Sequence, residues 1–289
     1  MSRAAPPAAG HALERLPPQA LFVLGAISQY VGAALAVLLF ASVPAAGVAW
    51  LRVVAAAAVL VAWRRPWRTR WTRARLQLVA AFGVVLALMN LCFYLAIDRL
   101  PLGTAVAIEF CGPIFVAALG SRARRDVVAL VLGVAGVIAL ADVHLTGSPG
   151  GFALAAGAGV FWAAYIVLGH RVAADREIRP QDGLALAMAI GALGLAPALV
   201  VSAVPALVDP LLLAACLAVG VASSVVPYAL EQIAMRRLPR ARFALLLALL
   251  PATAAVVGAL VLGQVPGAVE AGGIALVVAA ASLRTHTDF

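Results

Sequence analysis

Lysine is absent from this chain of 289 residues, and charged residues of all kinds make up only 11% of it. A soluble domain carries about 25% charged residues, whereas here 65% of the residues are apolar. The solvent around most of the chain is therefore lipid. Because a spanning helix needs about 20 apolar residues, this length accommodates roughly ten spans and leaves little chain for a soluble domain.

Residues suited to metal binding or catalysis are also scarce. The three cysteines lie singly in apolar runs, the four histidines are scattered, and the sequence contains no GKS or GKT phosphate loop, no HExxH and no Cys-x-x-Cys. We therefore expect no metal, no cofactor and no ATP-driven step. A membrane-embedded enzyme acting on lipid-linked substrates is an alternative, but such enzymes cluster acids or histidines near the membrane surface, and Asp98, Asp142 and Asp209 are dispersed.

Long apolar runs bounded by arginine, proline or glycine predict an all-α integral membrane protein with ten transmembrane helices. The alternating ten-residue segments of a membrane barrel are missing. The predicted helices cover residues 20–41, 45–63, 76–97, 101–120, 126–142, 150–170, 182–204, 211–233, 239–262 and 266–283.

The arginines predict the orientation of these helices. The loop WRRPWRTRWTRAR alone carries six of them, and 19 of the 21 arginines fall in every second loop or at the two ends of the chain. Since short cytoplasmic loops retain basic residues, we expect a multi-pass protein of the bacterial inner membrane with both termini in the cytoplasm. The net charge of +9 then reflects topology and the lipid bilayer, and not a nucleic-acid partner.

A weak internal repeat divides the chain. Residues 95–113 align with residues 233–251 at an offset of 138, with Arg-Leu-Pro and a later proline in common. The two copies lie on opposite sides of the membrane by the arginine rule, which is typical of inverted repeats in secondary transporters. We expect a disordered cytoplasmic segment over 1–19, five-helix halves over 20–142 and 150–283, and a cytoplasmic tail over 284–289.

Two ionisable residues fall deep within predicted spans. Glu109 and Arg52 each lie about 12 Å along a helix from a proline at the outer end. Ionisable residues at this depth are costly and mark functional sites. They could bind the ammonium and carboxylate of a zwitterion, or form an ion pair that only locks two helices together. Glu231, nearer the arginine-rich end, could act in an inner gate or simply reach the membrane surface.

Other polar and aromatic residues share helix faces with these charges and are candidates to line a cavity, although packing roles are equally compatible with Trp162 and Tyr165. They are Ser28, Gln29, Asn90, Tyr94, Trp162, Tyr165 and Tyr228. A carboxyl group in a partly dry cavity binds a proton more readily than one in water, which would suit proton-coupled antiport. Prolines within the spans, including Pro113, Pro227 and Pro251, are candidate hinges, although proline is common in membrane helices anyway.

The chain resembles the drug/metabolite transporter superfamily, EamA type, and within it the threonine and homoserine exporters. The resemblance covers most of the sequence and is most specific in MNLCFYLAIDRLPLGTAVAIEFCGPIFVAALGSR at 89–122, GAGVFWAAYIVLGHR at 157–171 and VVPYALEQIAMRRLP at 225–239. It implies ten helices in two inverted halves. The site residues that it supports are Arg52, Asn90, Tyr94, Glu109, Pro113, Trp162, Tyr165, Tyr228 and Glu231. Where the family commonly has a glutamate before the proline of helix nine, this chain has Leu250.

We therefore expect a secondary transporter that exports amino acids or related small metabolites by proton antiport, with Glu109 as its central acid. An alternative is a multidrug or other metabolite efflux transporter. A membrane-embedded enzyme or a scaffold is the alternative from another class. The expected partners of the transporter are a small-molecule substrate, protons and the bilayer. Both a monomer and a homodimer are compatible with the sequence.

Overall fold

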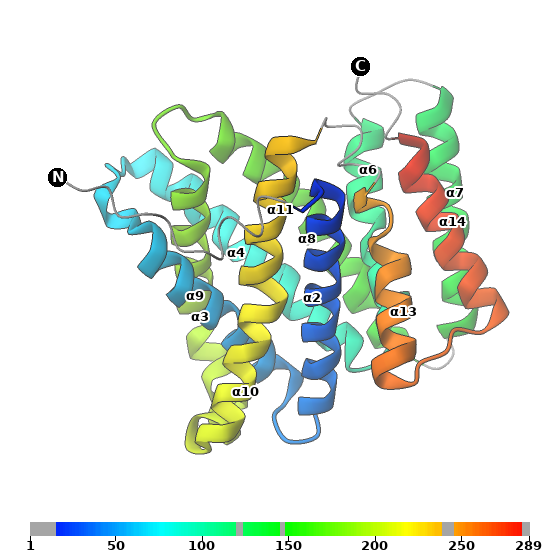
Figure 1. Ribbon diagram of the computed structural model, residues 1–289, viewed down its shortest axis with the longest axis horizontal. Coiled ribbons are helices and arrows are strands. Elements are labelled where there is room, and N and C mark those ends of the chain that lie inside the picture. The colour runs from blue at the N-terminus through cyan, green and yellow to red at the C-terminus, as the bar shows by residue number, and fades with distance from the viewer. Residues whose placement is uncertain (1–15, 120–123, 145–147, 239–245, 285–289) are drawn as a thin grey trace.

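The computed structural model describes residues 16–119, 124–144, 148–238 and 246–284, and every regular element in these ranges is helical (Figure 1). The predicted all-α architecture is thus confirmed. The helices are α2 (Pro18–Leu39), α3 (Ala45–Arg64), η1 (Pro66–Arg68), α4 (Arg73–Ile97), α5 (Leu102–Glu109), α6 (Cys111–Leu119), α7 (Arg124–His144), α8 (Pro149–Ala174), α9 (Pro180–Val208), α10 (Pro210–Gly220), η2 (Val221–Val225), α11 (Val226–Arg237), α13 (Leu250–Leu262) and α14 (Ala268–Arg284).

Proline begins four of the α-helices, α2, α8, α9 and α10. The first position of a helix suits proline, because its N–H would have no intrahelical acceptor and its fixed φ is already helical. Asp209 adds a second start signal at α10, since its carboxylate accepts hydrogen bonds from the backbone N–H groups of Leu211 and Leu212 at 2.8 and 3.2 Å. The dispersed aspartates thus include at least one whose role is local.

Six helices in the described residues are long and apolar enough to cross a membrane, by length and composition, and four apolar helices are shorter. Large apolar side chains cover their outer faces: Ile138 on α7 is 62% exposed and Leu193 on α9 is 74% exposed. Such surfaces suit lipid, and the chain is a multi-pass membrane protein. The full count of ten spans stays a prediction.

Two predicted helices are interrupted. The segment 101–120 divides at Phe110 into α5 and α6, and the segment 211–233 divides into α10, the π-helical turn η2 and α11. Both interruptions precede a proline, Pro113 or Pro227, which offers no N–H to the carbonyl four residues earlier. The helix expected from residue 239 is described only from 246 onward, and α13 itself begins at Leu250.

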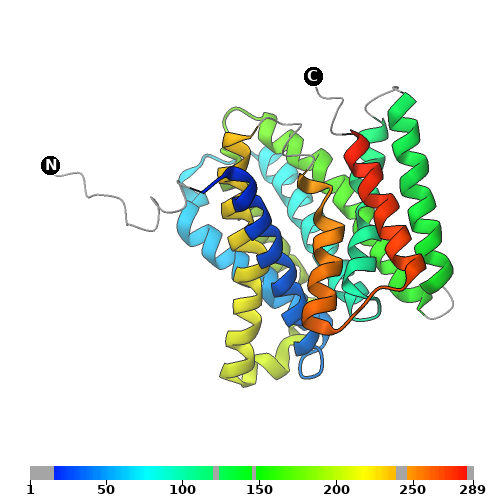
Figure 2. The same ribbon diagram turned by 45° about the vertical axis from the view of Figure 1, so that its right-hand side comes forward.

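Helices from the two sequence halves interleave. The helix α3 packs along α9, and α4 packs along both α8 and α9, while α2 lies between α11 and α13 (Figures 1 and 2). Glycines allow the backbones to touch. A Cβ atom at Gly47 would lie 2.3 Å from the Ser202 carbonyl oxygen, and one at Gly83 would lie 2.2 Å from that of Ala187. Small residues at such crossings are typical of membrane helix packing.

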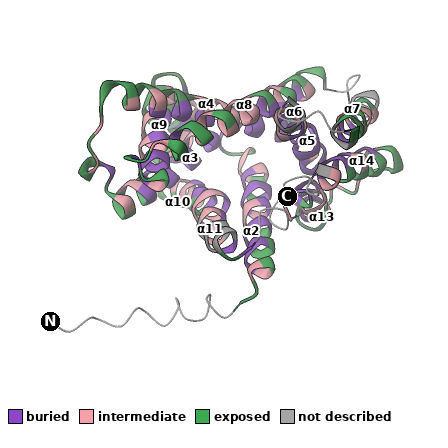
Figure 3. Ribbon diagram, turned by 90° about the horizontal axis from the view of Figure 1, so that it is seen from above, coloured by how far each residue is buried: buried purple, intermediate pink, exposed green. Residues whose placement is uncertain are grey.

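The remaining helices form one end of the molecule. Here α7 packs against α14, and α13 packs against α5 (Figure 1). Seen from above, the buried faces of the helices turn toward the middle of the elongated bundle, and exposed residues line its rim (Figure 3). The deepest core joins α2, α4 and α5 through residues such as Phe22, Tyr94 and Leu102.

A buried acid ties together the arginine-rich end of the molecule. Asp182, at the start of α9, is only 4% exposed. Its carboxylate accepts hydrogen bonds from Arg64 Nε and from the Thr69 hydroxyl, both at 3.1 Å. Since Arg64 ends α3 and Thr69 lies between α3 and α4, this cluster fixes the end of α3 and the segment after it against α9.

A second, more exposed ion pair lies at the same end. Arg75 Nε donates to Asp175 at 2.9 Å, and Arg75 Nη1 pairs with Glu177 at 2.6 Å. The backbone N–H of Glu177, and after it the Arg75 guanidinium, hold the pKa of Asp175 below its usual value. The first turn of α4 and the α8–α9 loop are therefore joined to each other.

Candidate functional site

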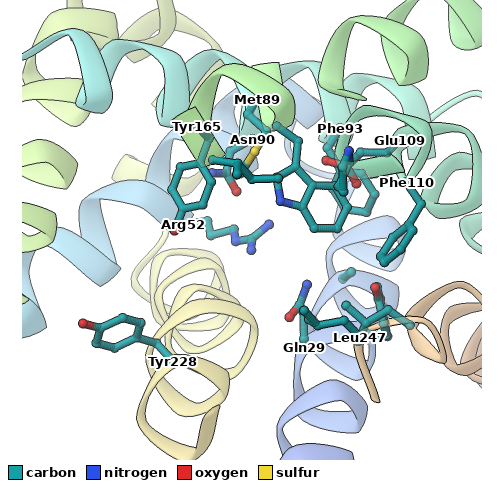
Figure 4. Close-up of a pocket in the computed structure, with 16 residues that line it drawn as sticks. Gln29, Arg52, Met89, Asn90, Phe93, Glu109, Phe110, Tyr165, Tyr228 and Leu247 are labelled. Atoms are coloured by element: carbon teal, nitrogen blue, oxygen red, sulfur yellow. The ribbon is translucent and has the colours of Figure 1, made fainter. Parts of the chain in front are cut away.

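A cavity of about 450 Å³ lies among α2, α3, α4, α5, α6, α8, α11 and α13 (Figure 4). Its volume falls within the range of about 300–1,000 Å³ that is typical of small-molecule sites. The side chains around it are Gln29, Tyr30, Ala33, Arg52, Met89, Asn90, Phe93, Glu109, Phe110, Pro113, Trp162, Tyr165, Ile166, Tyr228, Leu247 and Leu250. Seven of the predicted cavity residues and one predicted hinge are thereby brought to one place.

Arg52 extends into this cavity from α3 and is 9% exposed. Its Nε donates to the Ser224 hydroxyl and its Nη2 donates to the Ser223 carbonyl, each at 2.9 Å. Both acceptors belong to the π-helical turn η2. A buried guanidinium needs such partners, because an unpaired buried charge is strongly destabilising.

Tyr94 lies beneath Arg52 and not in the cavity wall. The Arg52 Cζ atom is 5.1 Å from the centre of the Tyr94 ring, which is a cation–π contact. The ring is fully buried and meets Phe40 and Phe93 edge to face. The prediction that Tyr94 shares a face with the site is consistent with this position, but its contact is with the arginine.

Glu109 ends α5, just before the interruption at Phe110, and is 8% exposed. Pro113 cannot donate to the Glu109 carbonyl, and α8 comes so close there that a Cβ atom at Gly159 would lie 2.8 Å from that oxygen. Among the residues that the structure describes, no ion pair joins Glu109 to Arg52. The two charges therefore face one cavity without neutralising each other by direct contact.

Two amides complete the polar side of the cavity. Asn90 Nδ2 donates to the Leu86 carbonyl of its own helix at 2.9 Å, which fixes the side chain while leaving its oxygen out of that bond. Gln29 comes from α2, on the other side of the cavity (Figure 4). Ser28, the neighbouring candidate, is not in the cavity wall, because its hydroxyl donates to the Ala222 carbonyl at 2.8 Å.

Aromatic side chains lie beside these polar groups in the cavity wall, with Tyr165 next to Asn90 and Phe93 next to Glu109 (Figure 4). The Trp162 ring meets Phe110 edge to face, with centroids 5.1 Å apart, and Tyr165 stacks on Phe82 at 5.0 Å. Trp162, Tyr165 and Tyr228 all line the cavity as well. Packing and cavity lining, the two alternatives for Trp162 and Tyr165, thus occur together in these side chains.

Two smaller cavities lie next to the first and share Tyr165 and Tyr228 with it. One of about 310 Å³ extends to His170 and Pro180, near the arginine-rich α8–α9 loop. The other, of about 140 Å³, extends to Ser224. The two tyrosines therefore border both the central cavity and a cavity toward the arginine-rich end.

The remaining predicted site residues, and the lining residues that were not predicted, are placed as follows. The side chain of Glu231 lies outside the described residues. Pro227 lines the smallest cavity, and Pro251 lies in the first turn of α13, beside the cavity residue Leu250. Residues that the sequence did not single out include Met89, Phe93, Phe110, Leu247, Ser223 and Ser224. The only sequence signal for any of these residues was the pair of serines, Ser223 and Ser224, in an otherwise apolar run before Pro227.

Within the described ranges, no three histidine, cysteine, aspartate or glutamate side chains lie together in a group that could hold a metal ion. The three cysteines are free thiols on separate helices. Among the described residues that line the cavity, the available chemistry is that of one carboxyl, one guanidinium, amides and aromatic rings.

Comparisons with known proteins agree with this picture. The EamA-like transporter family matches residues 149–285. The threonine/homoserine exporters RhtA of Escherichia coli strain K12 and of Salmonella typhimurium strain LT2 are each 38% identical over 263 residues, covering 89% of this chain and 87% of theirs. A protein of known crystal structure, 21% identical, matches with a TM-score of 0.58 over 92% of this chain and 95% of its own, which bears on the fold alone.

Proposed function

Since this chain belongs to the EamA-like transporter family, we propose that it exports threonine- or homoserine-like amino acids or related small metabolites by proton antiport. The family consists of transporters, so the chain is a transporter and not a membrane-embedded enzyme. Homologues that export threonine and homoserine, at 38% identity over 87% of their length, support an amino acid as the cargo.

The observation that carries the proposal is a buried cation and a buried acid on one cavity without an ion pair between them. A zwitterionic amino acid presents a carboxylate and an ammonium group to complementary charges. In the proposed complex the carboxylate binds Arg52, the ammonium approaches Glu109, and the amides of Gln29 and Asn90 bind the remaining polar atoms. An interior charge that served only to lock helices would instead be paired with its opposite.

Glu109 also serves as the proton carrier in this proposal. When the substrate ammonium leaves, the carboxylate is buried without a counter-ion in contact, and binding a proton removes the cost of that charge. Substrate and proton therefore compete for the same acid. Competition of this kind produces exchange, because Glu109 is neutralised by one or the other during each passage through the membrane.

An inverted repeat of residues 20–142 and 150–283 is part of the proposal, and the helix packing supports it. In chain order, α2 corresponds to α8, α3 to α9, α4 to α10 with α11, and α6 to α13. Exchanging corresponding helices maps the contact between α4 and α8 onto that between α11 and α2. The same exchange maps α4 with α9 onto α10 with α3, and α6 with α8 onto α13 with α2. The Arg-Leu-Pro repeat itself falls partly within 239–245, outside the described residues.

We further propose that the arginine-rich end faces the cytoplasm of a bacterium, with both termini on that side. The cavities bordered by Tyr165 and Tyr228 extend from the centre toward this end, which is consistent with an inward-facing state that loads substrate from inside. Pro113, Pro227 and Pro251 lie at helix interruptions or a helix start near the cavity and serve as hinges for the change to an outward-facing state. Glu231 contributes to the inner gate in this scheme.

The aromatic wall favours one other candidate, the efflux of hydrophobic cations. Phe93, Phe110 and Trp162 would attract an organic cation through their ring faces, and Leu250 adds a further apolar side chain to the wall. Such a substrate would have no need of Arg52. Direct transport of threonine and of a labelled lipophilic ammonium compound, each measured in wild type and in Arg52→Ala, separates the two candidates, because only threonine transport should depend on Arg52.

The decisive experiment measures threonine-dependent proton flux in proteoliposomes. Glu109→Gln keeps the shape of the side chain and removes its charge, and we expect it to abolish that flux. Glu177→Gln is the matched control, because Glu177 is exposed at the arginine-rich end, and it should retain flux. Flux that is unchanged in Glu109→Gln would rule out the assigned role.

A further inference from the structure

The π-helical turn η2 follows from the proline that comes after it. In this turn the Val226 N–H donates to the Val221 carbonyl, five residues back. The Ser223 carbonyl lacks its α-helical donor, because residue 227 is proline and has no N–H. The Ala222 carbonyl lacks both possible donors, since Val226 is engaged with Val221 and Pro227 cannot donate. Two carbonyls at membrane depth therefore need donors from other helices.

Side chains from two neighbouring helices supply those donors. Ser28 on α2 donates its hydroxyl to the Ala222 carbonyl at 2.8 Å. Arg52 on α3 donates Nη2 to the Ser223 carbonyl at 2.9 Å, and its Nε donates to the Ser224 hydroxyl at 2.9 Å. The guanidinium is thus attached to the turn that the proline creates.

The turn itself is fixed by close packing. A Cβ atom at Gly32 of α2 would lie 2.9 Å from the Ser223 Cβ, and one at Gly220 would lie 2.9 Å from the Arg52 carbonyl oxygen. The backbones of α2, α3 and the turn are therefore in contact, with no room for a side chain between them. The acceptors for Arg52 cannot move far relative to the helix that carries it.

These bonds use one edge of the guanidinium and leave the other available. Nε and one N–H of Nη2 point at the turn, while the Tyr94 ring covers one face at 5.1 Å. The Ser223 hydroxyl donates to the Val219 carbonyl at 2.6 Å, so Tyr94 is the donor in its 3.5 Å contact with Ser223. Within the described residues the Nη1/Nη2 edge has no acceptor, and two parallel N–H groups match a carboxylate.

We propose that Ser224 and the Ser223 carbonyl are positioning groups that hold the Nη1/Nη2 edge of Arg52 toward the cavity, and that they thereby set the preference for substrates with a free carboxylate. The inference rests on the proposed amino-acid export. Beyond that function, the carboxylate preference depends on the π-helical turn before Pro227, because Ser224 and the Ser223 carbonyl orient the Arg52 side chain.

The test compares two competitors in proteoliposomes that exchange labelled L-threonine. Unlabelled L-threonine carries the carboxylate, and L-threoninamide lacks it. The half-inhibitory concentration of L-threoninamide divided by that of L-threonine measures carboxylate preference and does not depend on how much protein is active. Losing one hydrogen bond to a charged group should lower this ratio by about tenfold in Ser224→Ala, and Ser224→Thr, which keeps the hydroxyl, should restore it.

Two further variants separate positioning from general damage. Pro227→Ala returns an N–H that competes with Arg52 for the Ser223 carbonyl, so the ratio should fall here too, and this variant decides if Ser224→Ala does not fold. Ser282→Ala removes a hydroxyl that bonds a backbone carbonyl of α14 at 2.8 Å, and it should keep the wild-type ratio. Wild-type exchange with an unchanged ratio in Ser224→Ala would overturn this inference alone. Absence of threonine and homoserine exchange in the wild type would overturn the proposed function with it.

Discussion

The contact between α4 and α9 gives a prediction that can be calculated from the backbone. In Gly83→Ala, the new Cβ atom would lie 2.2 Å from the Ala187 carbonyl oxygen, whereas ordinary van der Waals contact begins at 3.4 Å. The difference between these distances is about 1.2 Å, and since the obstacle is backbone, no side-chain rotation can remove it. The two helices have to move apart.

The cost of that separation follows from lost dispersion contacts. A gap of about 1 Å forfeits about a quarter to a half of a contact worth about 0.1–0.2 kcal/mol. If about 40 atom pairs are affected, roughly the number that one buried leucine makes, the loss is about 2 kcal/mol. For a chain of this size we expect the melting temperature to fall by about 5 °C.

The assay is thermal unfolding of the purified protein in detergent, with Gly194→Ala as the matched control. Gly194 lies within the same helix α9, and a Cβ atom there would meet nothing within 4 Å. Alanine is the better helix former by about 0.8–1.0 kcal/mol in water, so this variant should melt at or above the wild-type temperature. A Gly83→Ala protein that melts as high as wild type would refute the reasoning.

Three further predictions concern stability. Asp182→Asn should destabilise the protein by about 2–3 kcal/mol, less than for a fully buried pair because Arg64 is partly exposed, and an unchanged denaturation midpoint would contradict this. The lowered pKa of Asp175 means that its contribution to stability is present above its ordinary pKa and is lost as pH falls through the lowered value. The difference in melting temperature between wild type and Asp175→Asn should therefore shrink progressively as the pH is lowered past the ordinary pKa of an aspartate. Trp50→Phe removes the 2.8 Å bond from Nε1 to the Ala192 carbonyl and should cost about 1 kcal/mol by the same assay.

The helices and the two buried charges could be predicted from the sequence for one reason. In an apolar chain, a charge inside a run is costly, so Arg52 and Glu109 stand out by position alone. The arginine-rich loops stand out in the same way, and the ion pairs of Arg64 and Arg75 join two of them.

Other parts of the site could not be read in this way. Phe93 and Leu250 line a cavity, yet an apolar residue facing a cavity has the same identity as one facing lipid. Tyr94 was predicted as a wall residue because spacing gives the helix face but not the depth at which a neighbour covers it. The role of Ser224 depends on which helix lies opposite the turn before Pro227, and no local pattern contains that information.

The glycine contacts divide the molecule into parts of different stiffness. At Gly47 and Gly83 the backbone of one helix touches a backbone carbonyl group of α9, so neither helix can slide along α9 without first moving away from it. The helices α3, α4 and α9 therefore behave as one rigid unit. Between α2 and α11 the approach is looser, since a Cβ atom at Gly25 would lie 3.5 Å from Pro227. In the proposed transport cycle, shear would therefore be easier where Gly25 meets Pro227 than where Gly32 meets Ser223, and α3, α4 and α9 would form the rigid frame against which other helices move.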